Sequence, residues 1–549
     1  MNDSGMIDLV PAAVRQAWRE AGWYADQPLF ELFEEHVQVT PGKPAVLTLN
    51  SQVNYRQLHD YSLRLAKGLR DRGVVAGDVI AYQIGNGWQC CAIDLAAAVL
   101  GAVVAPFPPG RGRLDIEALL KRCCARAVVV APHQGDTDLC AVIESLRPTL
   151  LSLRILVVDG GERQGWASLA SLLASAPLAA SDRPVVCPNS PARLLVSSGT
   201  ESEPKLVAYS HNALVGGRGR FLQRLHPQGD GLRGLYLVPL GSAFGSTATA
   251  GCLAWLGGSL AVLDRFEAAD AIRAIEQLRP THVFAVPTML QRIAADPALA
   301  EVDRRSLVAL VSGGALIDGQ SIRRCVEAFG CALVSLYGSA DGVNCHNLPD
   351  DPFEVVLSSV GQPNPSVCEI KIVDEGGDEL PAGQVGEIKA RGPLSPMQYV
   401  NAPELDQRYR DDQGWVCTGD LGLINASGHL VLVGRKKDVI IRGGANISPA
   451  QIERIVTAHP DVVSAACVPV ADAELGQRVC ICLTLRPGAQ RFALKQLTDY
   501  LGDQGLEKNK WPEYLRFHHE LPLSPAGKVD KKALAADLAF LQRRLNIAC

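Results

Sequence analysis

Short apolar runs rich in β-branched residues alternate along most of this chain with longer segments of helical periodicity, such as residues 55–72 and 270–278. Strand–helix alternation of this kind predicts an α/β fold, in which mixed or parallel sheets are covered by helices. Residues 90–107, the most apolar stretch, predict a buried helix that runs into a strand. The other expected buried strands are residues 79–84, 127–132, 154–159, 194–198, 282–287, 307–314 and 333–338.

The character of the sequence changes near residue 368, where strands of alternating polarity flank turns rich in Gly, Asp, Asn and Pro. Residues 368–391 predict one β-hairpin, and residues 421–434 predict a second. Two consecutive hairpins favour antiparallel pairing over the crossovers of the preceding segment. We therefore expect a small antiparallel unit at the end of the N-terminal domain.

Three consecutive basic residues, 435–437, mark the expected domain boundary. Beyond it, Ser448 precedes Pro449 and lies three residues before Gln451, a pattern that predicts a helix start with a side-chain cap. The remaining residues alternate strand and helix patterns and suffice for a small domain. We expect a large N-terminal domain over residues 1–434 and a small, mobile α+β domain over residues 435–549.

Bulk composition narrows the classes of function. The 549 residues carry a formal net charge of −5, which argues against a nucleic-acid partner. Sixteen cysteines without metal-ligand spacing indicate reduced thiols in a cytoplasmic protein rather than a zinc site. The first residues lack a signal-peptide pattern. Residues 90–107 are shorter than the ~20 residues that a membrane span needs, so no span is expected.

The stretch "LLVSSGTESEPKLVAYS" (residues 194–210) places a loop rich in hydroxyls and glycine between two apolar strands. Backbone N–H groups in such a loop converge on an anion, and hydroxyls and a lysine add further donors. The loop lacks the Gly-Lys-Ser/Thr ending of the P-loop, and a strand rather than a helix follows it. The candidate donors are Ser197, Ser198, Gly199, Thr200, Ser202 and Lys205.

Four further stretches make the loop part of a larger pattern. The loop resembles the phosphate-binding loop of the adenylate-forming superfamily, which includes acyl- and aryl-CoA synthetases and the adenylation domains of peptide synthetases. The other stretches resemble that family's adenine and magnesium motif, its ribose motif, its hinge and its C-terminal lysine motif, in the same order. They are "LYGSADG" (336–342), "GWVCTGDLG" (414–422), "GRKKDVIIRGGANISPAQIE" (434–453) and "LPLSPAGKVDKKAL" (521–534).

The resemblance implies a ligase that uses ATP and Mg²⁺ to turn a carboxylic acid into an acyl-adenylate, and then passes the acyl group to coenzyme A. Both steps place charge on phosphate oxygens, which cations and N–H donors stabilise. Lys528 and Arg435 are the implied catalytic residues, and Lys528 is expected to bridge the carboxylate and the α-phosphate. The implied nucleotide-binding residues are Ser197, Ser198, Gly199, Thr200, Lys205, Gly313, Gly314, Ala315, Tyr337, Gly338 and Asp420.

Individual roles follow from the same resemblance. Asp420 is expected to accept hydrogen bonds from both ribose hydroxyls, and Tyr337 is expected to stack on adenine. Thr200 and Asp341 are the expected metal ligands, although the family usually has glutamate where this chain has Asp341. The hinge is expected at Lys437, and the glycines that leave room for the thiol arm are expected to be Gly443 and Gly444.

Two departures from the family pattern concern the phosphate loop and the acid. Glu201 and Glu203 place two carboxylates beside the expected triphosphate. Ala243 replaces the aspartate that would pair with an amino group, which disfavours an α-amino acid. The small residues Gly241, Ser242, Ala243 and Gly245 suggest a roomy pocket with apolar walls, which favours a bulky apolar or cyclic acid. An alternative is that the local glycines only permit close packing. The expected acyl pocket comprises Gly241, Ser242, Ala243, Phe244, Phe284, Val286 and Leu316.

Three hypotheses about activity remain open at this point. The leading one is an acyl-CoA synthetase of specialised metabolism, and a close rival loads the pantetheine thiol of a carrier protein in trans, because no carrier domain follows the last motif. The third is a nucleotide-binding relative without turnover, suggested by the altered phosphate loop. The sequence leaves a homodimer as an open alternative.

Overall fold

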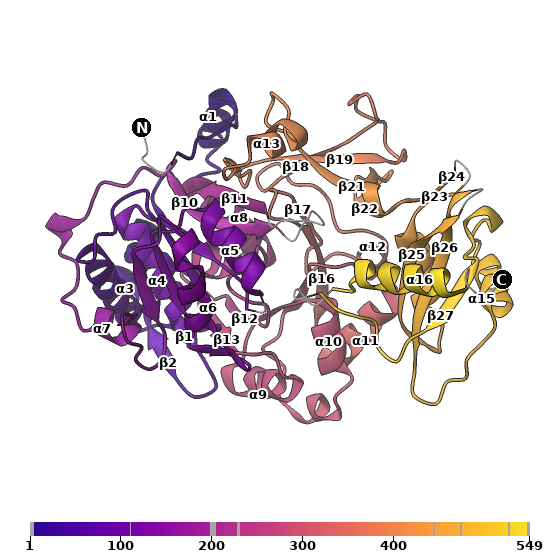
Figure 1. Cartoon of the computed structure of the whole chain (residues 1–549), viewed down its shortest axis with the longest axis horizontal. Helices are drawn as coiled ribbons and strands as arrows, with labels where there is room; N and C mark the ends of the chain where they lie inside the picture. Colours follow the sequence, from indigo (N-terminus) through magenta and orange to yellow (C-terminus); the bar gives the residue numbers. More distant parts are fainter. Residues whose placement is uncertain are drawn as a thin grey trace.

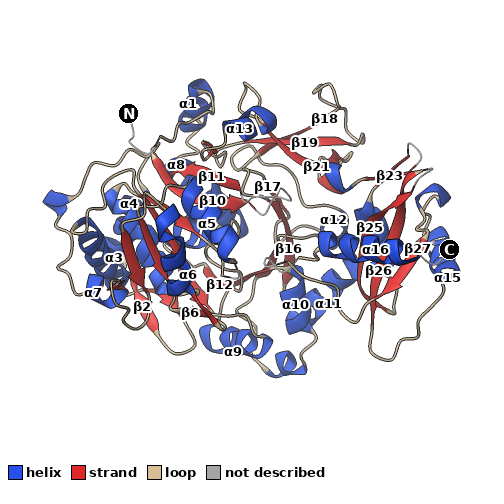
Figure 2. Cartoon of the chain, in the orientation of Figure 1, coloured by secondary structure: helices blue, strands red, loops and turns tan. Residues whose placement is uncertain are grey.

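The computed structural model describes residues 5–109, 111–197, 205–227, 231–442, 445–472, 475–524 and 528–545. Two large sheets with helices form the N-terminal body, a small antiparallel sheet lies beside them, and a separate sheet with helices forms the C-terminal unit (Figure 1). The predicted fold class, including the antiparallel unit, is confirmed. Figure 2 shows the same view with helices lying on both large sheets.

The first large sheet is parallel from β1 to β16 and ends in an antiparallel strand on each side, because β2 and β17 both follow short reversals. Long crossovers place sequence-distant strands next to each other. Its strands, in spatial order, are β17 (Asn344–His346), β16 (Ala332–Gly338), β15 (Ala309–Gly313), β14 (His282–Ala285), β12 (Arg233–Tyr236), β13 (Ser259–Val262), β1 (Pro44–Leu47) and β2 (Gln52–Asn54).

The second large sheet contains the two strands that flank the predicted phosphate loop, and these strands pair with each other in antiparallel fashion. A short strand from far along the chain pairs with the second of them. The spatial order is β20 (Gln398–Tyr399), β11 (Lys205–Ser210), β10 (Pro191–Ser197), β4 (Val103–Pro106), β3 (Val79–Gln83), β5 (Ala127–Val130), β8 (Ile155–Val158) and β9 (Ala167–Ser168).

Side chains that alternate along the strands divide between an inner core and two outer ones. In β3, Ile80 and Tyr82 enter the core between the sheets, whereas Val79 and Ala81 pack against helices outside. The predicted buried helix is confirmed as α4 (Trp88–Leu100), which has eleven of its thirteen residues buried. The inner layer also contains α2 (Leu29–Val39), α3 (Tyr55–Arg70), α8 (His211–Leu225) and the π-helical segment η3 (Ala248–Trp255).

The outer layers complete a helix–sheet–helix–sheet–helix arrangement. The second sheet is covered by α5 (Arg113–Arg122) and α6 (Leu139–Leu146). The first sheet is covered by α9 (Ala268–Leu278), α10 (Pro287–Ala294) and α11 (Gly319–Phe329). In the part of the chain that the structure describes, no helix has both the length and the apolar character that crossing a bilayer requires. Shorter helices are α7 (Leu169–Leu173), α12 (Phe353–Ser358) and α13 (Pro403–Tyr409).

The remaining two sheets are smaller. The predicted antiparallel unit consists of β18 (Glu369–Val373), β19 (Gly386–Arg391), β21 (Val416–Ile424) and β22 (Leu430–Arg435). In the C-terminal unit, two helices cover one face of the sheet and a third covers the other. This unit comprises β23 (Ile440–Arg442), β24 (Ala445–Ile447), β25 (Val462–Asp472), β26 (Gly476–Leu485), β27 (Tyr514–Phe517), α14 (Pro449–Thr457), α15 (Leu494–Asp503) and α16 (Lys531–Leu545).

The predicted helix start at residue 449 is confirmed, but the prediction of its side-chain cap is wrong. Ser448 occupies the cap position of α14 without a capping hydrogen bond. Its hydroxyl instead donates to the carbonyl oxygen of Val433 at 2.6 Å. The cause is tertiary: β22 passes beside the start of α14, and its carbonyl is a competing acceptor that the local sequence does not reveal.

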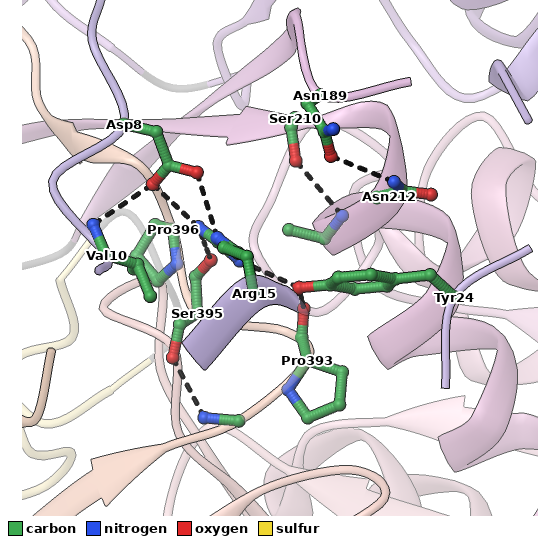
Figure 3. A network of polar contacts seen from close by, with 12 residues as sticks. Asp8, Val10, Arg15, Tyr24, Asn189, Ser210, Asn212, Pro393, Ser395 and Pro396 are labelled. Carbon is green, nitrogen blue, oxygen red and sulfur yellow. Dashed lines mark hydrogen bonds and ion pairs between the residues drawn. The ribbon is translucent and has the colours of Figure 1, made fainter. Parts of the chain in front are cut away.

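A buried arginine attaches the N-terminal segment to the body of the protein (Figure 3). Arg15, on helix α1 (Ala12–Glu20), donates to both carboxylate oxygens of Asp8, at 2.9 and 3.0 Å, and to the hydroxyl of Tyr24 at 2.9 Å. It also donates to the carbonyl oxygen of Ser395 at 3.0 Å, and Tyr24 donates to that of Pro393 at 3.1 Å. The network therefore fixes the connection between β19 and β20.

Arg15→Met is expected to lower the free energy of unfolding by about 2–3 kcal/mol, because the buried carbonyl oxygen of Ser395 and the hydroxyl of Tyr24 lose hydrogen bonds from a charged donor. Arg19→Met on the same helix is the matched control. Arg19 pairs with Asp26 at 3.1 Å, but the two side chains are 34% and 45% exposed, so its loss should cost about 1 kcal/mol or less. Urea unfolding followed by tryptophan fluorescence measures both, and equal losses would contradict the structural role of Arg15.

Candidate active site

Asp420 is the centre of a polar cluster at the edge of the first large sheet. The hydroxyl of Tyr337, near the end of β16, donates to Oδ2 of Asp420 at 2.7 Å. Burial and the neighbouring carboxylate raise the pKa of Tyr337, so its phenol stays protonated and donates. Arg435 contacts Oδ1 of Asp420 through Nε at 3.0 Å, because β21 and β22 pair these two residues. Both carboxylate oxygens are therefore held in place from two sides.

The C-terminal unit contributes Lys528 to the same cluster. Burial and the positive charge of Arg435 lower the pKa of Lys528, while Asp420 acts in the opposite direction. The backbone around the lysine is closed by a hydrogen bond from the amide of Ser524 to the Lys528 carbonyl oxygen at 2.6 Å. Tyr337, Asp420 and Arg435 are thus in direct contact, and Lys528 lies close enough to Arg435 and Asp420 for their charges to act on it, although the four residues come from sequence segments up to 191 residues apart.

Two glycines at the end of β15 leave the backbone there uncovered by side chains of its own, beside this cluster. Gly313 pairs with Leu336 of β16, and a Cβ added to Gly313 would lie 3.0 Å from Cε1 of Phe244. Gly314 has a φ of +84°, a conformation that favours glycine. Ala315 and Gly338 lie at the same carboxyl edge of the two adjacent strands. Ligands of open α/β sheets bind at this edge.

Only the two ends of the predicted phosphate loop lie within the described residues. Ser197 ends β10 and is paired with Lys205, which begins β11. Ser198, Gly199 and Thr200, like Glu201 and Glu203, lie outside the residues that the structure describes. The pairing brings the two ends of the loop next to each other at the end of a hairpin.

Lys205 lies against aromatic rings that the sequence did not identify. Its Nζ is 3.9 Å from the ring centre of Tyr409 and 5.7 Å from that of Tyr399, and the residue is only 8% exposed. The hydroxyl of Tyr399 donates to Oδ1 of Asp341 at 2.8 Å. The ammonium of Lys205 and the carboxylate of Asp341 therefore share one aromatic neighbour, which links the phosphate loop to the expected metal ligand.

A single magnesium-binding carboxylate fits the chemistry of this region. Among the described residues, no three His, Cys, Asp or Glu side chains are grouped as a metal site. Mg²⁺ commonly takes one or two carboxylates and completes its shell with water and substrate phosphates, so a lone carboxylate is compatible with it. Asp341 is held in position by Tyr399, and its expected companion Thr200 lies outside the described residues.

The predicted acyl pocket is assembled only in part. Phe244 and Phe284 lie 6.1 Å apart with their rings at 71°, and Phe284 stacks on Tyr236 at 4.4 Å. Val286 lies next to Gly314, 3.4 Å from the Cβ that an alanine there would carry. Leu316, by contrast, is 55% exposed.

The loop at residues 241–245 is a tight turn. Ser242 donates to the carbonyl oxygen of Pro239 at 2.7 Å and accepts from the amide of Gly245 at 2.9 Å. A Cβ on Gly245 would lie 2.1 Å from the Pro239 oxygen, so this glycine permits close packing, as the alternative interpretation held. Ala243 is partly buried and packs against the inner core. Gly241 has more room, with its nearest neighbour at 3.3 Å.

The connection between the two units runs through a short turn. Lys437 lies in the 3₁₀ segment η5 (Lys436–Asp438), directly after β22 and before β23. Gly443 and Gly444 lie outside the described residues, between β23 and β24. The expected hinge residue is thus in the connecting segment.

Comparison with known families accounts for almost the whole arrangement. Residues 33–400 match the family described as AMP-binding enzyme, and residues 451–528 match the AMP-binding enzyme C-terminal domain. These two matches cover the large sheets and most of the C-terminal unit. Among the residues with expected roles, five lie in the interval between the two matches: Asp420, Arg435, Lys437, Gly443 and Gly444.

Individual relatives align with this chain over nearly their full length, in agreement with the family matches. A salicylyl-CoA synthase / salicylate adenylyltransferase of a Streptomyces species is 31% identical over 538 residues, which is 95% of this chain and 96% of the relative. A salicyl-AMP ligase / salicyl-S-ArCP synthetase of Mycobacterium tuberculosis is 29% identical and covers 98% and 96%. The crystal structure of ATP-bound MatB from Rhodopseudomonas palustris superimposes with a TM-score of 0.83 at 25% identity, covering 93% of this chain and 99% of that one. The chain therefore belongs to the adenylate-forming superfamily of AMP-binding enzymes, as its motifs predicted.

Proposed function

We propose that this protein is an acid–thiol ligase that forms an acyl-CoA in two half-reactions. In the first, a carboxylate oxygen attacks the α-phosphorus of ATP, and the bond to the β-phosphate oxygen breaks, giving acyl-adenylate and pyrophosphate. In the second, the thiolate of CoA attacks the acyl carbon and AMP leaves. Adenylation of an acid is the part common to the family, whereas the acid and the thiol are our assignments.

The observation that carries the proposal is the convergence of Lys528 with Asp420, Arg435 and Tyr337. An ammonium at this place can pair with the incoming carboxylate and the α-phosphate together, and it stabilises the charge that develops between them. The Asp420 carboxylate offers about four lone-pair directions. After its contacts with Tyr337 and Arg435 it keeps acceptor capacity for the ribose hydroxyls.

The other residues of the site position the phosphates. Lys205 and the donors of the phosphate loop would hold the β- and γ-phosphates. Magnesium, held by Asp341 and Thr200, would supply charge neutralisation at the phosphate oxygens. Tyr399 keeps the Asp341 carboxylate aimed, since its hydroxyl donates to one oxygen of that carboxylate at 2.8 Å.

The acyl end of the site supports a cyclic or aromatic acid. Phe244 and Val286 lie next to the glycines that end β15, and the fully buried Phe284 packs against Phe244 from behind. Ala243 provides no carboxylate for an ammonium group, so an α-amino acid would leave its charge unpaired. The relatives described above act on salicylate, which is an aromatic acid, and this agrees with our assignment.

The second half-reaction requires the C-terminal unit to move. In this proposal Lys528 serves the first half-reaction beside Asp420 and Arg435, so the thiol would reach the acyl carbon after a rotation of the C-terminal unit. We propose that the segment around Lys437 is the hinge, and that Gly443 and Gly444 then line the thiol path. CoA is the proposed acceptor. A carrier protein in trans is the alternative, because one relative is a salicyl-S-ArCP synthetase.

Substrate-dependent exchange of labelled pyrophosphate into ATP tests the first half-reaction. With aromatic, cyclic and straight-chain acids offered separately, we expect exchange with at least one cyclic acid and none with α-amino acids. Exchange with none of the acids would favour a nucleotide-binding protein without turnover. The thioester product is then sought with CoA and with a holo carrier protein, and a product formed only with the carrier would correct the acceptor.

A further inference from the structure

Arg218, on helix α8, is a buried cation whose contacts are incomplete. The residue is 7% exposed, its Nε donates to Oγ of Ser246 at 2.6 Å, and its guanidinium carbon lies 4.5 Å from the ring centre of Tyr209. Its Nη1 is buried without a hydrogen-bond partner. Within the described part of the chain, no carboxylate forms an ion pair with Arg218. The guanidinium therefore keeps donor capacity in a dry place.

Two other buried arginines of this protein have a carboxylate partner of the kind that Arg218 lacks among the described residues. Arg193 is 2% exposed, and its Nη1 contacts Oδ2 of Asp94 at 2.5 Å. Arg15 is 8% exposed and contacts Asp8 at 2.9 Å. Burial lowers the pKa of Arg218 despite the opposing contact with Tyr209. Since arginine stays charged at neutral pH, a buried guanidinium without a carboxylate is costly unless an anion arrives from outside.

The position of Arg218 associates it with the acyl pocket. Ser246, which accepts from Arg218, follows the pocket loop directly and donates to the carbonyl oxygen of Ala243 at 2.5 Å. Tyr209, on β11, packs under the guanidinium and donates to the carbonyl oxygen of Ala340 at 2.8 Å. The cation is thus connected through Ser246 to the pocket loop and through Tyr209 to the motif at residues 336–342.

We propose that Arg218 and Ser246 bind an anionic or hydrogen-bond-accepting oxygen at the far end of the acid, so that the substrate carries a second acidic group besides its reacting carboxylate. This inference rests on the proposed adenylating function and specifies its substrate class. A guanidinium recognises phenolate and carboxylate oxygens alike, so the second group is a ring hydroxyl or a second carboxyl. An acid without such a group leaves the buried N–H unpaired and is rejected.

Matched pairs of acids in the pyrophosphate exchange assay test the proposal. Benzoate is compared with 3- and 4-hydroxybenzoate and with isophthalate, and hexanoate is compared with adipate. The wild type is expected to favour the members with a second oxygen group by at least about 100-fold in kcat/KM. The hydroxy and dicarboxylic members of the panel distinguish the two chemical sources of that oxygen.

Arg218→Met separates recognition from folding, because the ratio within each pair is measured in one protein. The variant should reduce the preference to about threefold or less and keep, or raise, kcat/KM for the unsubstituted acid. Arg220→Met is the control on the same helix, since Arg220 donates to the Trp23 carbonyl oxygen instead, and it should leave the ratio unchanged.

Equal losses for both members of a pair, or a wild-type preference for the unsubstituted acid, would overturn the inference alone. Absence of exchange with every acid overturns the proposed function and this inference with it.

Discussion

Lys528→Ala is expected to lower substrate-dependent ATP–pyrophosphate exchange by about 100- to 1,000-fold, the usual effect of removing one group that stabilises developing charge. In the proposed mechanism the ammonium joins two anionic reactants, the carboxylate and the α-phosphate, and its removal would leave more of their mutual repulsion uncompensated. The second half-reaction does not need this cation, so chemically prepared acyl-adenylate should still transfer to the thiol at about the wild-type rate. The two rates are measured separately.

Lys495→Ala is the matched control, because Lys495 belongs to the same unit but its side chain is 83% exposed and pairs with Asp499 on its own helix. Its exchange rate should stay within about twofold of wild type. A variant at residue 528 that slows both half-reactions equally would indicate a structural defect. One that exchanges pyrophosphate normally would remove Lys528 from the mechanism.

The fold could be predicted from short stretches of sequence, because each strand and hairpin has a recognisable pattern within its own residues. The buried strands before residue 340 are visible as short apolar runs rich in β-branched residues, and the two later hairpins are visible as alternating polarity on either side of turns rich in Gly, Asp, Asn and Pro. The helix that begins at Pro449 was predicted on the same basis. The hydroxyl of Ser448 was misassigned, since its acceptor on Val433 is brought close only by the pairing of β21 with β22 and the docking of α14.

The parts of the site that the sequence did not predict are contacts between residues that lie far apart in the chain. Lys205 was identified as a phosphate ligand, but Tyr399 and Tyr409 were not identified as its neighbours. They reach it because β20 pairs with β11 across some 190 residues of sequence. Arg218 was overlooked for a different reason: within a helical pattern its charge is typical of an exposed face, and only the packed structure reveals that it is buried.

Asp420→Ala is expected to raise KM for ATP by at least about 100-fold, because two hydrogen bonds to a charged acceptor contribute about 1.5–3 kcal/mol each. Asp420→Asn keeps the shape and loses the charge, so its effect should be intermediate. Asp412→Ala, in an exposed turn nearby, is the control and should leave KM for ATP unchanged. Steady-state exchange kinetics at saturating acid measure all three variants.

The nucleotide 2′-deoxyATP distinguishes a ribose contact from a general loss of structure. Wild type should prefer ATP to 2′-deoxyATP, because the deoxy analogue leaves one acceptor direction of the carboxylate unpaired. Asp420→Ala has no such acceptor, so it should use the two nucleotides almost equally well, however much activity it has lost. A preference that survives the substitution would mean that the ribose is bound elsewhere. In that case the contacts of Asp420 with Tyr337 and Arg435 would serve to align the first sheet with the antiparallel unit and not to hold the nucleotide.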